Sequence, residues 1–143
     1  MTRIDFYILP DQDPAQRSVL ACRLAEKAYT QGLATYIHTA SDQECRVLDD
    51  LLWTFREGSF LPHCVHADAE GEPPPILVGH DVEPETHTDL LINLAQAVPL
   101  FFGRFQRVAE IVDRQDELLE QARQRYLFYK ERGYELHSHH LKG

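Results

Sequence analysis

The chain has 143 residues and a mass of 16.5 kDa, and its 14 Lys and Arg against 23 Asp and Glu give a formal net charge of −9. The length fits one domain spanning 1–143, and 43% hydrophobic residues exclude a disordered chain. No apolar run reaches the ~18 residues of a transmembrane helix, there is no signal-peptide pattern, and three cysteines without CxxC spacing argue against a disulfide framework. We therefore expect a cytoplasmic protein without a membrane segment.

The first part of the chain alternates predicted strands and helices. Asp13 and Ser41 are residues of the kind that begin helices, and Gly32 is of the kind that ends one. Strands are predicted over 4–9 and 33–39, and helices over 14–31 and 42–55. This alternation predicts an α/β fold, in which a mostly parallel, Rossmann-like sheet is flanked by helices.

The second part is less regular and ends in a well-marked helix. Strands are predicted over 76–79, 90–94 and 106–112, a short helical turn over 99–103, and loops over 67–75 and 80–88. Asp113 is the predicted N-cap of the last helix, which has acidic residues in its first turn, basic residues in its last turn and Gly133 directly after it. The histidines beyond it are expected on a solvated tail.

Nucleotide chemistry is excluded by the first strand–helix turn. A dinucleotide site needs glycines there, so that the backbone can approach a pyrophosphate at the helix N-terminus. Residues 10–14 (Pro-Asp-Gln-Asp-Pro) contain no glycine. They do contain two aspartates, which would repel the anion. The chain also lacks the GxxxxGK[ST] and GxSxG motifs, and Cys22 and Cys45 fall inside predicted helices as core residues. We expect no catalytic site and no cofactor.

Two groups of residues could ligate a metal. His63, Cys64 and His66 form the first, and His137, His139 and His140 form the second. Neither spacing matches a strong zinc motif, and in a strand the first two side chains of the first group would point to opposite faces. We expect a packed His63 and no metal, and a small metal-dependent enzyme remains an alternative.

The acidity is unevenly distributed along the chain. Residues 1–103 carry 6 basic and 16 acidic side chains, whereas 104–143 carry 8 basic and 7 acidic ones. The acidic segment 1–103 disfavours binding to nucleic acid, because the affinity of such binding comes mainly from Lys and Arg that contact phosphates. The basic last helix either complements its own dipole or binds an acidic partner, and direct single-stranded DNA binding through its tyrosines remains an alternative.

An aromatic segment follows the second predicted helix. It places the only Trp and two Phe within eight residues, in Trp53-Thr-Phe-Arg-Glu-Gly-Ser-Phe60, and continues into Leu-Pro62-His63. Large aromatic residues at a helix end either fill the core or form a binding patch.

These features together resemble a known family. The chain is similar over its whole length to the chi subunit of bacterial DNA polymerase III holoenzyme, an accessory protein of the clamp loader. The resemblance rests on Phe6–Leu9, on Leu48-Asp49 with Leu52-Trp53, on Ser59–His63, on Asp89–Leu94, and on Ala122–Tyr126 followed by Tyr129 and Gly133-Tyr134. It implies a Rossmann-like fold with no bound nucleotide and no catalytic site of its own, within a holoenzyme that is a DNA-directed DNA polymerase.

The resemblance also implies two protein partners and no direct binding of DNA. The psi subunit, which links chi to the clamp loader, would bind an apolar surface that includes Trp53 and Phe60, with Pro62 and His63 beside them. In some relatives a helicase-type repair protein competes for that surface.

The second implied partner is the acidic C-terminal tail of single-stranded DNA-binding protein (SSB). The tail would bind the last helix at Arg123 and Tyr126, with Arg125, Tyr129 and Lys130 nearby. A tail that is rich in Asp and ends in an apolar residue suits an apolar pocket with a basic rim. The chain departs from the family at Leu127, where the relative compared has Lys, so one cationic contact is missing or is supplied by Lys130.

Overall fold

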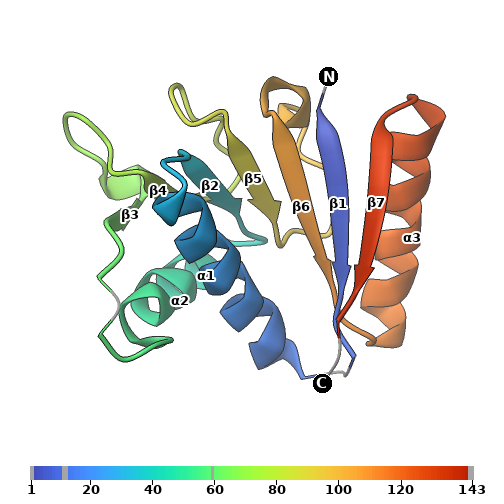
Figure 1. Cartoon of the computed structure of the whole chain (residues 1–143), viewed down its shortest axis with the longest axis horizontal. Coiled ribbons are helices and arrows are strands. Elements are labelled where there is room, and N and C mark those ends of the chain that lie inside the picture. Colours follow the sequence, from blue (N-terminus) through green and yellow to red (C-terminus); the bar gives the residue numbers. More distant parts are fainter. Residues whose placement is uncertain (1, 11–12, 59, 142–143) are drawn as a thin grey trace.

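The structure is a computed structural model that describes residues 2–10, 13–58 and 60–141, and its centre is a seven-stranded sheet (Figure 1). The strands are β1 (Arg3–Ile8), β2 (Thr35–His38), β3 (His63–Val65), β4 (Ile76–Gly79), β5 (Leu90–Asn93), β6 (Arg107–Val112) and β7 (Glu135–His140). Their spatial order is β3-β4-β2-β5-β6-β1-β7, and neighbours throughout the described sheet are parallel. The predicted α/β fold class is confirmed.

Helices cover both faces of the sheet (Figure 1). They are α1 (Pro14–Thr30), α2 (Asp42–Thr54) and α3 (Asp116–Glu131), with short 3-10 helices η1 (His66–Asp68) and η2 (Phe102–Arg104). The core under α1 and α2 is mostly aliphatic and includes Cys22 and Cys45, as predicted. Burial raises the pKa of the Cys22 thiol to about 12. The core under α3 is rich in aromatic rings. None of the described helices is long and apolar enough to cross a bilayer.

The helix ends follow the sequence in most places. The Asp13 carboxylate accepts a hydrogen bond from the Ala15 amide at 3.0 Å, and the Ser41 hydroxyl accepts one from the Glu44 amide at 3.1 Å. We expected Asp113 to be the N-cap of α3. This expectation is wrong, because the N-cap is Gln115. Asp113 is buried and accepts from the Gln115 amide at 3.0 Å, so it holds the turn before α3, and the helix begins later, at Asp116.

Two strands were missed in the sequence. β3 is only three residues long, and its His63 and Cys64 point to opposite faces, as the alternation of strand side chains predicted. β7 contains the histidines that we expected on a solvated tail. This expectation is wrong, because β7 pairs with β1 along its whole length and His139 stacks on Tyr7 with ring centroids 4.8 Å apart.

Some predicted features lie outside the described residues. Asp11 and Gln12 of the glycine-free turn are among them, as is Ser59 in the aromatic segment.

Candidate protein-binding sites

The C-terminal end of α2 carries an aromatic surface, which we define as Trp53, Phe60 and Pro62. Trp53 lies in the last turn of α2 and is 54% exposed, and Phe60 is 81% exposed. Pro62 is also exposed. Both aromatic residues were candidates for either core or binding patch, and the structure places both on the surface. Large exposed aromatic rings in one region are typical of protein-binding surfaces.

His63 lies beneath this surface rather than on it. The residue is buried at the start of β3, and its ring centroid is 4.4 Å from that of Trp53. Its Nδ1 lies 2.6 Å from the Leu61 carbonyl oxygen and its Nε2 lies 3.0 Å from the Asp49 carbonyl oxygen. His63 therefore ties β3 to α2 and supports the Trp53 ring, which makes it a positioning residue.

A groove runs between α3 and the sheet, with a volume of about 220 Å³. We call it the α3 groove. Arg123 and Tyr126 line it from α3, and Ser138 lines it from β7. The other lining residues are apolar and come from β1, β6 and α3, namely Phe6, Ile8, Val112, Leu119 and Ala122. It is thus an apolar groove with a cationic side chain at its rim.

The two principal candidates on α3 meet at this groove. The Tyr126 ring packs edge-on against Phe6, with centroids 5.4 Å apart. The Arg123 guanidinium is exposed and lies 3.5 Å from the Glu120 carboxylate, a surface pair that contributes little energy and is easily exchanged for another anion. Lys130 and Leu127 are exposed further along α3 but do not line the groove.

Arg125 and Tyr129 lie in the interior, which corrects the expectation that they extend an exposed tail-binding surface. Their spacing of four residues puts both on the face of α3 that packs on the sheet. The Arg125 Nε donates to Glu110 Oε1 at 2.8 Å, and the Tyr129 hydroxyl donates to Glu110 Oε2 at 2.6 Å. Burial, together with the Glu110 charge, raises the pKa of Tyr129 well above its usual value. These residues fix α3 to β6.

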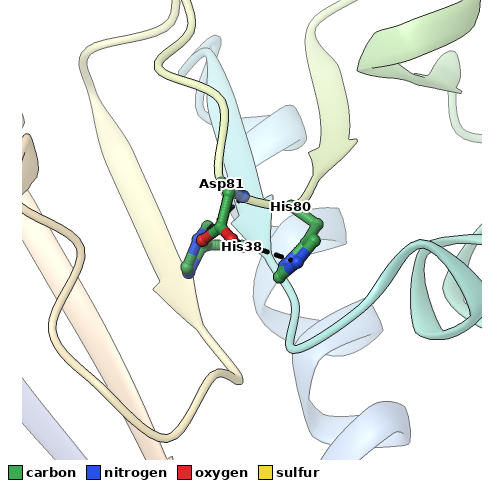
Figure 2. Close-up of side chains that lie close together, drawn as sticks. All are labelled: His38, His80 and Asp81. Carbon is green, nitrogen blue, oxygen red and sulfur yellow. Dashed lines mark hydrogen bonds and ion pairs between the residues drawn. The ribbon is translucent and has the colours of Figure 1, made fainter.

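Neither group of predicted metal ligands forms a metal-binding cluster. Within the described ranges, three ligating side chains come together elsewhere, at His38, His80 and Asp81 (Figure 2). His38 ends β2, and the other two residues follow β4 directly. The sequence did contain a usable signal, because the carboxyl ends of parallel strands meet at one edge of a sheet and both strands were predicted. Burial lowers the pKa of His38.

The fold and these surfaces define a parallel α/β protein with an exposed aromatic surface at one end of the sheet and an apolar groove with a basic rim at the other. Comparison with known proteins identifies its family. Residues 1–137 match the family model described as DNA polymerase III chi subunit, HolC. The chain belongs to the DNA polymerase III chi subunit family.

Relatives named DNA polymerase III subunit chi match along nearly their whole length. The Pseudomonas aeruginosa protein is 44% identical over 142 residues, which cover 99% of this chain and 98% of the relative. The Haemophilus influenzae protein is 31% identical, with 92% of each chain covered. The Escherichia coli protein is 26% identical, with 96% of this chain and 97% of the relative covered.

The fold also occurs in a larger protein. The crystal structure of T4 UvsW matches 98% of this chain with a TM-score of 0.67 and 9% sequence identity. The chain spans 41% of that protein. At this identity the likeness concerns the fold alone.

Proposed function

We propose that the chain is a non-catalytic adaptor of DNA replication, a single domain over 1–143 that works in the cytoplasm. It binds psi, and through psi the polymerase III clamp loader, with its aromatic surface. It binds the acidic C-terminal tail of SSB with its α3 groove. The observation that carries the proposal is the presence of two separate surfaces of different chemistry, supported by opposite faces of one sheet. Family membership supports the assignment, since the relatives are named as polymerase III subunits.

The aromatic surface suits a folded partner. Phe60 projects from the chain with 81% of its surface exposed, and Trp53 is held in place by His63 from below. A projecting aromatic ring buries a large area at low entropic cost when a partner provides a pocket for it. A helicase-type repair protein could occupy the surface in place of psi, as the family resemblance implies.

The α3 groove suits an extended acidic peptide with an apolar end. Its floor takes an apolar side chain, and Arg123 at the rim can form charge-assisted hydrogen bonds to a carboxylate. Arg123 must exchange Glu120 for the peptide, which costs little because both side chains are largely exposed. Lys130 adds positive charge on the same helix.

The charge distribution supports an indirect connection to DNA. A net charge of −9 repels phosphate, so an acidic protein recruited to coated single strands needs a protein contact to reach them. Direct DNA binding and a metal-dependent enzyme built on His63, Cys64 and His66 are less well supported. Direct DNA binding would need a more basic surface. The metal-dependent enzyme would need His63 as a ligand, but the His63 ring is engaged with two backbone oxygens.

The test is a crossed binding experiment by titration calorimetry, with purified psi and a synthetic SSB tail peptide as the two titrants. We expect Phe60→Ala to weaken psi binding at least about 30-fold, as a hot-spot residue does, and to leave tail binding intact. We expect Arg123→Ala to weaken tail binding and to leave psi binding intact. If either variant weakened both interactions, the assignment of two sites would fail.

Matched variants control for changes of surface. Leu100→Ala removes a side chain that is 96% exposed, and should leave psi binding unchanged. Arg46→Ala removes an exposed arginine on α2, and should leave tail binding unchanged. Melting temperatures complete the test. A melting temperature of Phe60→Ala far below that of the wild type would show that Phe60 belongs to the core instead.

A further inference from the structure

We propose that His38, His80 and Asp81 form a binding site for a divalent transition-metal ion, and that Zn²⁺ suits it best. The site lies apart from the aromatic surface and the α3 groove, and it does not depend on the proposed function. Its donor set of two imidazole nitrogens and one carboxylate is typical of zinc sites that keep a further position open. The hard cations Mg²⁺ and Ca²⁺ prefer oxygen ligands only.

The topology brings the three ligands together. β2 and β4 are hydrogen-bonded neighbours, and His38 pairs with Gly79, the residue directly before His80. One ligating atom from each of the three side chains lies within 4.8 Å of the others (Figure 2). His80 Nε2 is 3.2 Å and His38 Nε2 is 3.9 Å from the Asp81 carboxylate oxygens. Tetrahedral zinc with bonds of about 2.0 Å separates its ligands by about 3.3 Å, so the ligating atoms, which lie within 4.8 Å of one another, must move slightly closer together to bind the ion.

The surrounding hydrogen bonds favour the tautomer in which each neutral imidazole carries its hydrogen on Nδ1 and its lone pair on Nε2. His80 Nδ1 lies 3.0 Å from the Thr39 carbonyl oxygen, which can only accept, so Nδ1 carries the hydrogen. The Nε2 atom of the neutral His80 ring is then unprotonated and faces Asp81. A ligating histidine is commonly oriented in this way, by a donor bond from its other nitrogen.

The orientation of His38 is fixed by a chain of buried groups. Asn93 Nδ2 donates to the Glu110 carboxylate at 3.0 Å, and Asn93 Oδ1 accepts from the Ala95 amide at 3.1 Å. These contacts determine which end of the Asn93 amide faces His38. Its Oδ1 lies 3.1 Å from His38 Nδ1, which therefore donates and leaves Nε2 as the acceptor of the ring. That Nε2 accepts a long hydrogen bond of 3.4 Å from the Asp81 amide, which a bound ion would replace.

The loop that carries Asp81 is held in an uncommon conformation. Asp81 has φ of +54°, which is the left-handed region, and it is the only described non-glycine residue there. Asp is among the few side chains that tolerate this region. Backbone strain of this kind is concentrated at ligand-binding positions, and here it turns the carboxylate toward two imidazoles.

The test is metal titration of the full-length chain after treatment with a chelator, using Zn²⁺ in calorimetry and Co²⁺ in visible absorption. We expect one ion per chain, and ligand-field bands of tetrahedral Co²⁺ that Zn²⁺ abolishes. His80→Asn keeps a donor at the position of Nδ1 for the Thr39 carbonyl but removes the Nε2 ligand. Asp81→Asn keeps a residue that tolerates positive φ but removes the charge. Each variant should weaken Zn²⁺ binding at least about tenfold.

The control is a histidine at the far edge of the sheet. His137→Gln, on β7, should leave stoichiometry, affinity and the Co²⁺ spectrum unchanged. Added Zn²⁺ should raise the melting temperature of the wild type and of His137→Gln, and should raise that of Asp81→Asn by less at the same Zn²⁺ concentration. The proposal is overturned if His80→Asn and Asp81→Asn bind as the wild type does, if His137→Gln removes the binding, or if the wild type binds no Zn²⁺.

Discussion

The aromatic surface and the α3 groove differ in how the chain builds them. The aromatic surface uses residues 53–62, close together in sequence, and its support is one buried histidine that bonds to backbone oxygens. The α3 groove uses β1, β6, α3 and β7, and its helix is fixed by a buried ionic network around Glu110. The first is a projecting ring and the second is a recess.

This difference predicts different sensitivities. Surface residues at the end of α2 can change without disturbing the sheet, so substitutions there should alter binding alone. Substitutions beneath α3 should alter stability first, because the groove exists only while the helix is in place. Buried charges contribute little net stability when paired but are costly when one partner is removed.

The largest expected effect is at Arg125. Arg125→Met removes the cation and leaves the fully buried Glu110 carboxylate with only neutral donors. We expect the free energy of unfolding to fall by about 3–5 kcal/mol, as measured by urea denaturation. Arg123→Met, two residues away on the exposed face, should change it by less than about 0.5 kcal/mol. Equal losses in the two variants would contradict the difference between the faces of α3.

Trp53 should show the opposite behaviour. Trp53→Ala removes an exposed ring that packs at an angle against His63, so it should cost psi binding about 2 kcal/mol and change the unfolding free energy much less. Calorimetry and thermal denaturation separate the two quantities. Val47→Ala, a half-exposed apolar residue on the same helix, is the control and should bind psi normally. Normal psi binding by Trp53→Ala would show that Trp53 is not part of the psi-binding surface.

Salt should distinguish the two surfaces without any substitution. Screening shortens the range of charge interactions from ~10 Å at 0.1 M ionic strength to ~3 Å at 1 M. We expect tail binding to weaken by about 1 kcal/mol over this range, since exposed ion pairs contribute about 0.2–1 kcal/mol each. In our proposal psi binding rests on aromatic burial, so we expect it not to weaken. The comparison fails if the tail peptide binds equally well at both ionic strengths.

The smallest expected effect is a gain at Leu127. Leu127→Lys adds a cation to the exposed side of α3, one residue after Tyr126. Tail affinity should rise by about 0.2–1 kcal/mol at low salt, and fluorescence anisotropy of a labelled tail peptide would measure it. Leu127→Met keeps the side chain apolar and should give no gain. A similar gain from both variants would show that charge is not the cause.

The elements with strong apolar periodicity were predictable. The predicted strand over 76–79 has the same bounds as β4, and Asp13 and Ser41 cap α1 and α2 as predicted. β7 was missed because Glu-Leu-His-Ser-His-His has little apolar alternation, and an edge strand needs little. Its pairing is decided by β1, which lies far away in sequence.

The sites were predictable only in part. Exposure of Trp53 and Phe60 could not be decided from composition, because aromatic residues suit both core and surface. Arg125 was expected near the tail site from the family resemblance, which does not show which face of the last helix is exposed. Glu110 within the apolar strand Arg107–Val112 was the available signal, since a carboxylate there needs a buried cation. The group of His38, His80 and Asp81 was also predictable, because the two neighbouring parallel strands end at His38 and Gly79.

The position of β1 has a consequence for the order of folding. Both strands that pair with β1 come from the far end of the sequence, Arg107–Val112 and Glu135–His140. We expect contacts of such long sequence separation to form late, because closing the intervening loop costs entropy before the contacts repay it. The α3 groove takes part of its floor from β1, so it is complete only after the step in which these pairings form. A chain stalled before that step would lack the groove, and recruitment through it would therefore select fully folded molecules.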